Sequence, residues 1–274
     1  MSAIRRLIVL LIAAASFVTP AHLHAQNRGA PPSQSTAPFG VAQGAPSDGR
    51  GAKASAPIDL TGYWVAFVTE DWRYRMVTPP KGDYRGVPIT KEALQLVNAW
   101  DPAADEAAGN QCKSYGAAAI MRVPGRIHVT WQDDNTLRLD TDAGMQTRVF
   151  RFAPSPAAER KPTWQGQSAA RWERPGAGRG GDPAAPPRRL GSLTVVTTNM
   201  RAGYLRKNGV PYSESATVTE YFDVAPHPDG GQLLIVTTVV DDPRYLTQPF
   251  IVSSHFKKEA DASKWDPTSC SATW

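Results

Sequence analysis

The sequence predicts a mostly β protein in which a single antiparallel meander closes into a barrel of about ten strands, with one short helix. Three observations favour this fold class. Short stretches rich in β-branched and aromatic residues recur between residues 63 and 256. Most connections are short and carry turn residues, such as Pro124-Gly125 and Asp142-Ala143-Gly144. Closure is expected because an open sheet of this size would leave two unpaired edges.

The predicted strands share this β-branched and aromatic character. They span residues 63–69, 72–78, 115–122, 126–132, 136–141, 146–152, 164–172, 193–199, 217–222, 233–240 and 250–256. The one predicted helix spans residues 91–100, where Thr90 can cap the first turn and Asp101-Pro102 ends the helix. Residues 201–215, which include Asn208-Gly209, form a longer connection.

Residues 1–25 resemble a secretory signal peptide. Arg5-Arg6 precede an apolar run at 7–18, and Leu23-His24-Ala25 offers a cleavage site. The run is shorter than the roughly 20 residues that span a bilayer, which favours cleavage over an N-terminal membrane anchor. No later stretch has the length of a spanning helix. We therefore expect a soluble, periplasmic or secreted mature chain with no transmembrane segment.

The rest of the chain divides by composition. Residues 26–57 are rich in Gly, Ala, Pro, Ser and Gln, which predicts a disordered tether. Residues 58–274 form the single barrel domain. Residues 174–189 hold four Gly, four Pro and four Arg, which predicts a flexible loop inserted in that domain. The alternative of a phosphate-cradling loop lacks the Gly-Lys-Ser/Thr ending that such loops need.

The formal net charge of +5 is concentrated on segments that are predicted to be unfolded. Residues 1–25 carry +2, residues 26–57 carry +2 and residues 174–189 carry +3, which leaves −2 for the remainder. A nucleic-acid-binding fold concentrates positive charge on its folded body. The distribution therefore argues against nucleic acid as a partner and leaves weak contact with an anionic envelope surface as a hypothesis.

The chain contains two cysteines, Cys112 and Cys270. In an oxidising compartment a disulfide between them is the expected state. Reactive or metal-binding thiols are the alternative, but two isolated cysteines lack the paired spacing of a zinc site.

Alternation along the strands predicts which polar side chains point inward. Glu220 shares a face with Val218 and Phe222, and Arg148 shares one with Phe150. An inward carboxylate has to be paired, hydrogen-bonded or protonated. Glu220 and Arg148 are thus predicted to form a buried pair or the polar part of a cavity, unless the twist of the barrel carries Glu220 to the rim.

Tryptophan and histidine residues complete the candidate ligand-binding set. A barrel that encloses a ligand often lines it with aromatic rings, although core packing explains any single Trp equally well. After residues 1–25 no His-x-His or His-x-x-x-His spacing occurs, so no metal site and no cofactor is predicted. The candidate ligand-binding residues are Trp64, His128, Trp131, Arg148, Trp164, Glu220 and His255.

Two resemblances follow from short motifs. Asp59-Leu-Thr-Gly-Tyr-Trp64 resembles the Gly-x-Trp opening of calycin barrels, the lipocalins and avidins, which implies a lipocalin-like barrel. The helix at 91–100 departs from the lipocalin pattern, which has its helix near the end of the chain.

The chain from about residue 59 to 270 also resembles a group of uncharacterised secreted bacterial proteins. The matching stretches are 68–84, 99–102, 111–116, 163–168, 206–213, 242–250 and Cys270. This resemblance implies export and a β-rich domain, and no activity comes with it. The 174–189 loop is a departure from it.

Three functions remain open from the sequence. The first is binding of a small apolar or amphipathic ligand inside the barrel. The second is a cavity enzyme, a hydrolase or isomerase that uses Glu220 or His128 as general base. The third is a non-catalytic structural or interaction module of the cell envelope. Binding is preferred, and convergence of the polar candidates in one pocket would favour the enzyme.

Overall fold

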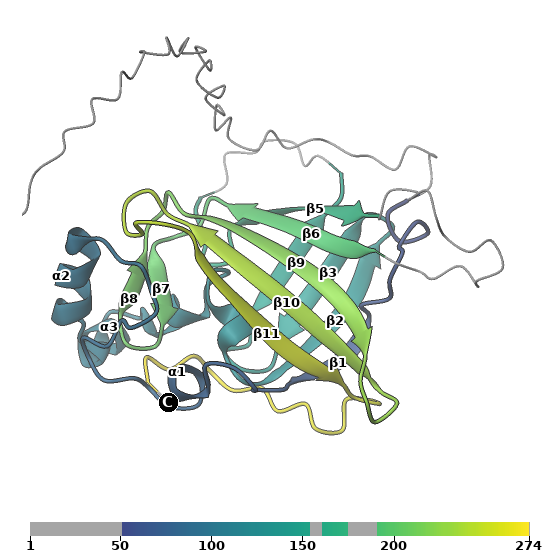
Figure 1. Cartoon of the computed structure of the whole chain (residues 1–274), viewed down its shortest axis with the longest axis horizontal. Coiled ribbons are helices and arrows are strands. Elements are labelled where there is room, and N and C mark those ends of the chain that lie inside the picture. The colour runs from purple at the N-terminus through teal and green to yellow at the C-terminus, as the bar shows by residue number, and fades with distance from the viewer. Residues whose placement is uncertain (1–50, 154–160, 175–190, 274) are drawn as a thin grey trace, which may run out of the picture. The chain divides into compact units, whose positions relative to one another are not determined.

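In this computed structural model, residues 51–153, 161–174 and 191–273 are described. Nine strands among them form a closed barrel (Figure 1). The barrel strands are β1 (Gly62–Ala66), β2 (Arg126–Asp133), β3 (Thr136–Thr141), β4 (Thr147–Arg151), β5 (Gln167–Glu173), β6 (Ser192–Thr198), β9 (Thr217–Pro226), β10 (Gln232–Asp241) and β11 (Phe250–Lys258). Their order around the barrel is β1-β11-β10-β9-β6-β5-β4-β3-β2, and β2 pairs with β1 to close it. The predicted fold class is confirmed.

The remaining elements are not part of the barrel wall. A separate hairpin consists of β7 (Gly203–Arg206) and β8 (Val210–Tyr212). The helices are α1 (Trp72–Arg75), α2 (Lys91–Ala99), α3 (Pro102–Ala107) and the two 3₁₀ helices η1 (Gln111–Tyr115) and η2 (Ile120–Arg122). In Figure 1, α2, α3 and the β7–β8 hairpin gather at one end of the barrel.

Two details depart from a simple meander. β4 and β5 run parallel, with Phe150 opposite Ser168, although every other neighbouring pair in the described barrel is antiparallel. The β7–β8 hairpin interrupts the path between β6 and β9, which nevertheless pair with each other. The long 201–215 connection predicted from the sequence is therefore a structured hairpin.

Two predicted strands are wrong. Residues 72–78 begin with the helical turn α1, because Asp71 adopts a left-handed backbone (φ 51°) that turns the chain away from β1. Residues 115–122 form the end of η1, a tight turn and η2. Their burial is continuous and does not alternate, since this segment passes between two cores. Strand propensity reflects context more than the backbone, and here the context is not a sheet.

The predicted helix is confirmed as α2, with a boundary difference of one residue. The Thr90 hydroxyl accepts a hydrogen bond from the backbone N–H of Ala93 at 3.3 Å. α3 was not predicted, because Asp101-Pro102 ends one helix and also begins the next. The Asp101 carboxylate accepts from Ala103 and Ala104, and Pro102 occupies the first turn, where a missing N–H does no harm.

The barrel interior is filled by large side chains. Alternate residues of the strands point inward and pack together. The bulkiest fully buried ones in this core are Trp64, Met121, Leu137, Leu139, Phe150, Leu193, Phe222 and Phe256. Burying such side chains stabilises the fold by about 1.5–3 kcal/mol each.

Residues 51–57, which the sequence assigns to the tether, are ordered against one end of the barrel. The Trp172 indole N–H donates to the carbonyl of Ala52 at 2.8 Å, and the Lys53 N–H donates to the carbonyl of Asp134 at 2.9 Å. A disordered tether was predicted for 26–57, but this stretch is ordered, because its backbone groups find hydrogen-bond partners in the β2–β3 turn and on Trp172.

A second core lies beyond the opposite end of the barrel. It joins residues of α2, of the β7–β8 hairpin and of the strand ends, including Val97, Leu205, Tyr212 and Phe250. Cys112 and Cys270 form the predicted disulfide, with their Cα atoms 5.1 Å apart. This bond ties the C-terminal segment to η1.

Three predicted segments lie outside the described residues. These are the signal peptide at 1–25, the first part of the tether at 26–50 and nearly all of the 174–189 loop. Within the described part of the chain, no helix has the length and apolar character needed to cross a membrane.

Candidate functional site

The candidate residues predicted from the sequence do not come together. Trp64, Arg148 and Glu220 lie in the barrel interior and are completely buried or nearly so. The Trp64 indole donates to the carbonyl of Leu60 at 2.9 Å, and the Lys258 ammonium lies 4.2 Å from its ring centroid. Trp64 is thus satisfied within the core.

Arg148 and Glu220 form the buried pair that alternation predicts. Two guanidinium nitrogens of Arg148 donate to the two carboxylate oxygens of Glu220 at 2.8 and 2.5 Å. Both side chains have an exposed fraction of 0%. Arg148 also donates to the Thr197 hydroxyl at 3.4 Å and lies over the Phe150 ring. Glu220 therefore does not reach the rim, and its carboxylate is occupied and closed to solvent.

The two strand histidines lie on the outer face of the barrel. His128 stacks on Tyr63 with ring centroids 3.9 Å apart, and partial burial lowers its pKa. His255 contacts the Thr69 hydroxyl at 3.0 Å and the Glu70 carboxylate at 3.1 Å. Successive residues of a strand point to opposite faces, so neither histidine can share a pocket with Glu220.

The other two tryptophans occupy separate places. Trp131 packs with Phe152 and Trp172 in an aromatic cluster of the barrel core. Trp164 lies before β5, where the Arg201 guanidinium sits 4.3 Å from its ring centroid. The seven candidates are thus spread over the interior, the outer wall and the connecting segments, and they define no common site.

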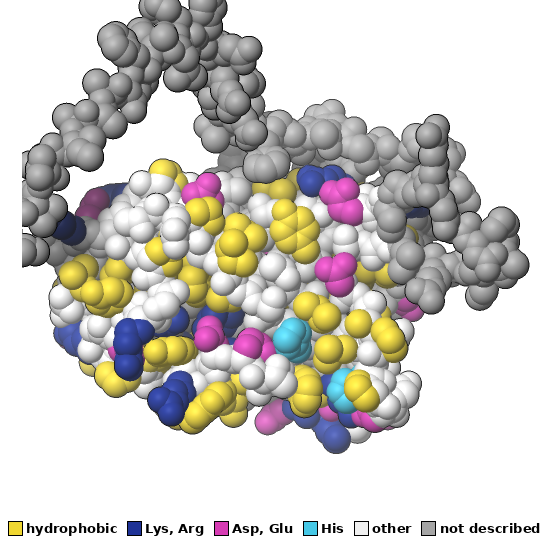
Figure 2. Space-filling view, in the orientation of Figure 1, with side chains coloured by type: hydrophobic (Ala, Val, Ile, Leu, Met, Phe, Trp, Pro, Cys, Tyr) yellow, Lys and Arg dark blue, Asp and Glu magenta, His cyan; other side chains and the backbone are white. Residues whose placement is uncertain are grey.

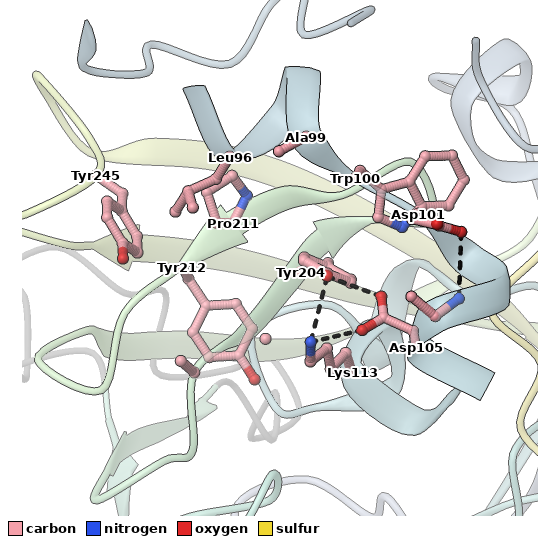
Figure 3. Close-up of a pocket in the computed structure, with 13 residues that line it drawn as sticks. Leu96, Ala99, Trp100, Asp101, Asp105, Lys113, Tyr204, Pro211, Tyr212 and Tyr245 are labelled. Atoms are coloured by element: carbon pink, nitrogen blue, oxygen red, sulfur yellow. Dashed lines mark hydrogen bonds and ion pairs between the residues drawn. The ribbon is translucent and has the colours of Figure 1, made fainter. Parts of the chain in front are cut away.

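The structure instead forms a cleft of about 340 Å³ outside the barrel (Figure 3). Its walls come from α2, α3, η1, the β7–β8 hairpin and the segment after β10. It is lined by Leu96, Ala99, Trp100, Asp101, Ala104, Asp105, Lys113, Ala202, Gly203, Tyr204, Pro211, Tyr212 and Tyr245. The lining includes one tryptophan and three tyrosines.

A polar network stands at one side of the cleft. The Lys113 ammonium donates to the Asp105 carboxylate at 2.6 Å, and the Tyr204 hydroxyl donates to its other oxygen at 2.8 Å. The Lys113 ammonium also lies 3.4 Å from the Tyr204 oxygen. Burial and the hydrogen bond to Asp105 raise the pKa of Tyr204, so this phenol keeps its proton.

This network presents a donor to the cleft. Among the described residues, Asp105 and Tyr204 account for two of the three N–H donors of Lys113. The third remains for an acceptor in the cleft. Cys112 precedes Lys113, so the disulfide holds this side chain in place.

Tyr212 also lines the cleft, but its hydroxyl does not reach the cleft surface. Its hydroxyl is buried and has no hydrogen-bond partner among the described residues. Burial raises the pKa of this phenol. A side chain at Gly116 or Gly203 would collide with the hydroxyl, so both positions need glycine.

Sequence reasoning missed this cleft because it considered strand faces only. Trp100 ends the predicted helix, and Tyr204 and Tyr212 lie in a stretch predicted to be a connection. The signal available in the sequence was a set of short stretches already singled out above. Four of them, at 99–102, 111–116, 206–213 and 242–250, each hold at least one lining residue, including Trp100, Lys113, Pro211 and Tyr245.

The described residues contain no group of three His, Cys, Asp or Glu side chains placed to hold a metal ion. Comparison of the chain with protein-family models, with curated proteins and with solved structures found no match.

Proposed function

We propose that this is an exported small-molecule-binding protein whose amphipathic ligand lies in the cleft beside the barrel. The observation that carries the proposal is the lining: a cleft of about 340 Å³ combines the aromatic residues Trp100, Tyr212 and Tyr245 with the polar network of Lys113, Asp105 and Tyr204. Ligand sites are typically apolar clefts of about 300–1,000 Å³ with a few fixed polar groups.

The lining also defines the ligand chemistry. Trp100, Tyr204 and Tyr245 offer ring faces and edges to a flat or apolar body. The Lys113 ammonium offers a charged donor, which favours a ligand with a carbonyl, hydroxyl or carboxylate acceptor at one end. The ligand class expected from the sequence is retained, but its place moves from the filled barrel interior to the cleft.

Export to the periplasm or the outside of the cell forms part of the proposal. The Cys112–Cys270 disulfide supports it, because such bonds persist in oxidising compartments. The signal-peptide pattern in residues 1–25 supports it independently. Membership of the lipocalin-like or secreted bacterial families rests on the motif resemblances alone.

Native mass spectrometry of the full chain, purified from its own periplasm or medium, tests the binding proposal. We expect a bound small molecule that Tyr204→Ala loses and that Tyr221→Ala retains. Tyr221 is the matched control, since it is an exposed tyrosine on the outer face of β9. A clean ligand-free mass for the wild-type protein, or equal retention by the two variants, would overturn the proposal.

The enzyme alternative gains no support from the positions of its residues. Glu220 is bound by Arg148 in the interior, whereas His128 stacks on the outer wall. Weak contact with an anionic envelope surface stays a prediction for the 174–189 loop. Loss of surface association on deletion of that loop is its test.

A further inference from the structure

Three buried arginines meet near α1, at the end of the barrel that carries the second core. Arg75 comes from α1, Arg122 from η2 and Arg206 from β7, and each is at most 6% exposed. The Arg75 Nε donates to the backbone carbonyl of Arg122 at 2.9 Å. Burial and repulsion from Arg122 lower the pKa of both Arg75 and Arg206, that of Arg206 to about 10. Arg122 is thus close enough to both to act on their charges.

Two acidic residues offset part of this charge. Glu70 pairs with Arg75, and Asp71 pairs with Arg122 at 3.0 Å. Both carboxylates reach the surface, with exposed fractions of 28% and 40%. In Figure 2, acidic and basic side chains gather near the position that α1 has in Figure 1. The two partly exposed carboxylates therefore lie between the buried arginines and the solvent.

Arg206 has no carboxylate partner among the described residues. Its Nη1 donates to the carbonyl of Arg85 at 2.8 Å, and its guanidinium lies 4.0 Å from the Tyr74 ring centroid. Asp83 is close enough to act on its charge but is hydrogen-bonded to Arg85. The cluster therefore contains three guanidinium charges and only two carboxylates that pair with them directly.

The cluster also holds unused donors. Arg75 Nη2, Arg122 Nη2 and Arg206 Nε are buried and have no hydrogen-bond partner among the described residues. A buried donor left without a partner costs about 1–3 kcal/mol, and more when the group is charged. These three donors lack acceptors among the described protein atoms.

We propose that Arg75, Arg122 and Arg206 form a binding site for a small oxyanion, a carboxylate or phosphate group. In this structure the Glu70 and Asp71 carboxylates occupy that site. Arginine is suited to this role because its planar fork matches carboxylate and phosphate oxygens. The anion enters when these exposed carboxylates turn outward. The site is separate from the aromatic cleft, so it does not depend on the function proposed above.

Titration of the full oxidised chain with inorganic phosphate and with acetate, at constant ionic strength set with sodium chloride, tests the proposal. Calorimetry measures affinity, and the arginine Nε–Hε resonances in ¹⁵N-correlated spectra report the site directly. We expect saturable binding that shifts the Arg206 resonance and becomes at least tenfold tighter in Asp71→Asn, which removes a competing carboxylate. Asp140→Asn, the same change on the outer face of β3, is the matched control and should bind like the wild type.

Arg206→Lys should weaken phosphate binding at least tenfold, because a lysine cannot reproduce the fork. Circular dichroism and thermal melting establish that each variant is folded. If Arg206→Lys does not fold, the wild-type resonance shift and the Asp71→Asn affinity decide the outcome. The proposal is wrong if neither anion shifts the Arg206 resonance in the wild type or in Asp71→Asn, or if a folded Arg206→Lys binds as tightly as the wild type.

Discussion

Removing Arg148 should destabilise the protein more than any comparable change on its surface. Its guanidinium makes two hydrogen bonds to Glu220, and both side chains are fully buried. In Arg148→Met the Glu220 carboxylate keeps its burial and loses its counter-charge. Breaking a buried pair in this way costs about 3–5 kcal/mol. For a domain of this size, each kcal/mol lowers the Tm by about 2–4 °C, so a loss of roughly 6–20 °C is expected.

The double variant Arg148→Met/Glu220→Leu separates pairing from burial. An apolar pair of similar volume removes both desolvation penalties. The free energy of unfolding of the double variant should therefore be within about 1 kcal/mol of the wild-type value or higher than it. Urea unfolding of the oxidised protein measures all three stabilities. Arg138→Met serves as the control, because the exposed Arg138–Asp140 pair should contribute less than about 1 kcal/mol. A loss below about 1 kcal/mol in Arg148→Met, or a double variant as unstable as the sum of the single variants, would refute this reasoning.

Three further predictions concern stability. Reduction of the Cys112–Cys270 disulfide, which closes a separation of 158 residues, should lower the free energy of unfolding by about 5 kcal/mol in the chain-entropy model, as measured by urea unfolding with and without reductant. Gly209→Ala should lower the Tm much more than Gly230→Ala does. Both glycines have positive φ, but only at position 209 would the added methyl group collide with the Trp100 ring. Burial lowers the pKa of Lys207 from 10.5 to about 8, so the unfolded chain binds more protons between these values. Stability should therefore rise as the pH increases from about 8 towards 10, and a Lys207→Met variant with an unchanged slope over that range would contradict the assignment.

The alternation of apolar and polar residues along the strands correctly predicted the inward side chains. It placed Glu220 and Arg148 inside, because successive strand residues must point to opposite faces, whereas His128, predicted as a ligand-binding residue, lies on the outer face. It failed at 72–78 and 115–122, where aromatic and β-branched residues pack against loops and cores that are distant in the sequence. Propensity carries no information about such neighbours.

The cleft and the arginine cluster could not be predicted in the same way. Trp100, Lys113, Tyr204 and Tyr245 come from four segments spread over much of the chain, and no local period joins them. Arg206 lies in a stretch that was expected to be a connection. Its burial arises because the β7–β8 hairpin folds against the loop that contains Arg85.

The closed β architecture, the inward faces of the strands, the capped helix α2 and the pairing of the two cysteines could all be predicted from the sequence. These properties follow from periodicity, turn chemistry and the single pairing that two cysteines allow. The tertiary structure alone decided the parallel β4–β5 contact, the helical turn at α1 and the convergence of aromatic and arginine side chains at one end of the barrel. Such convergence depends on how chain segments far apart in the sequence pack together, and a local pattern cannot encode it.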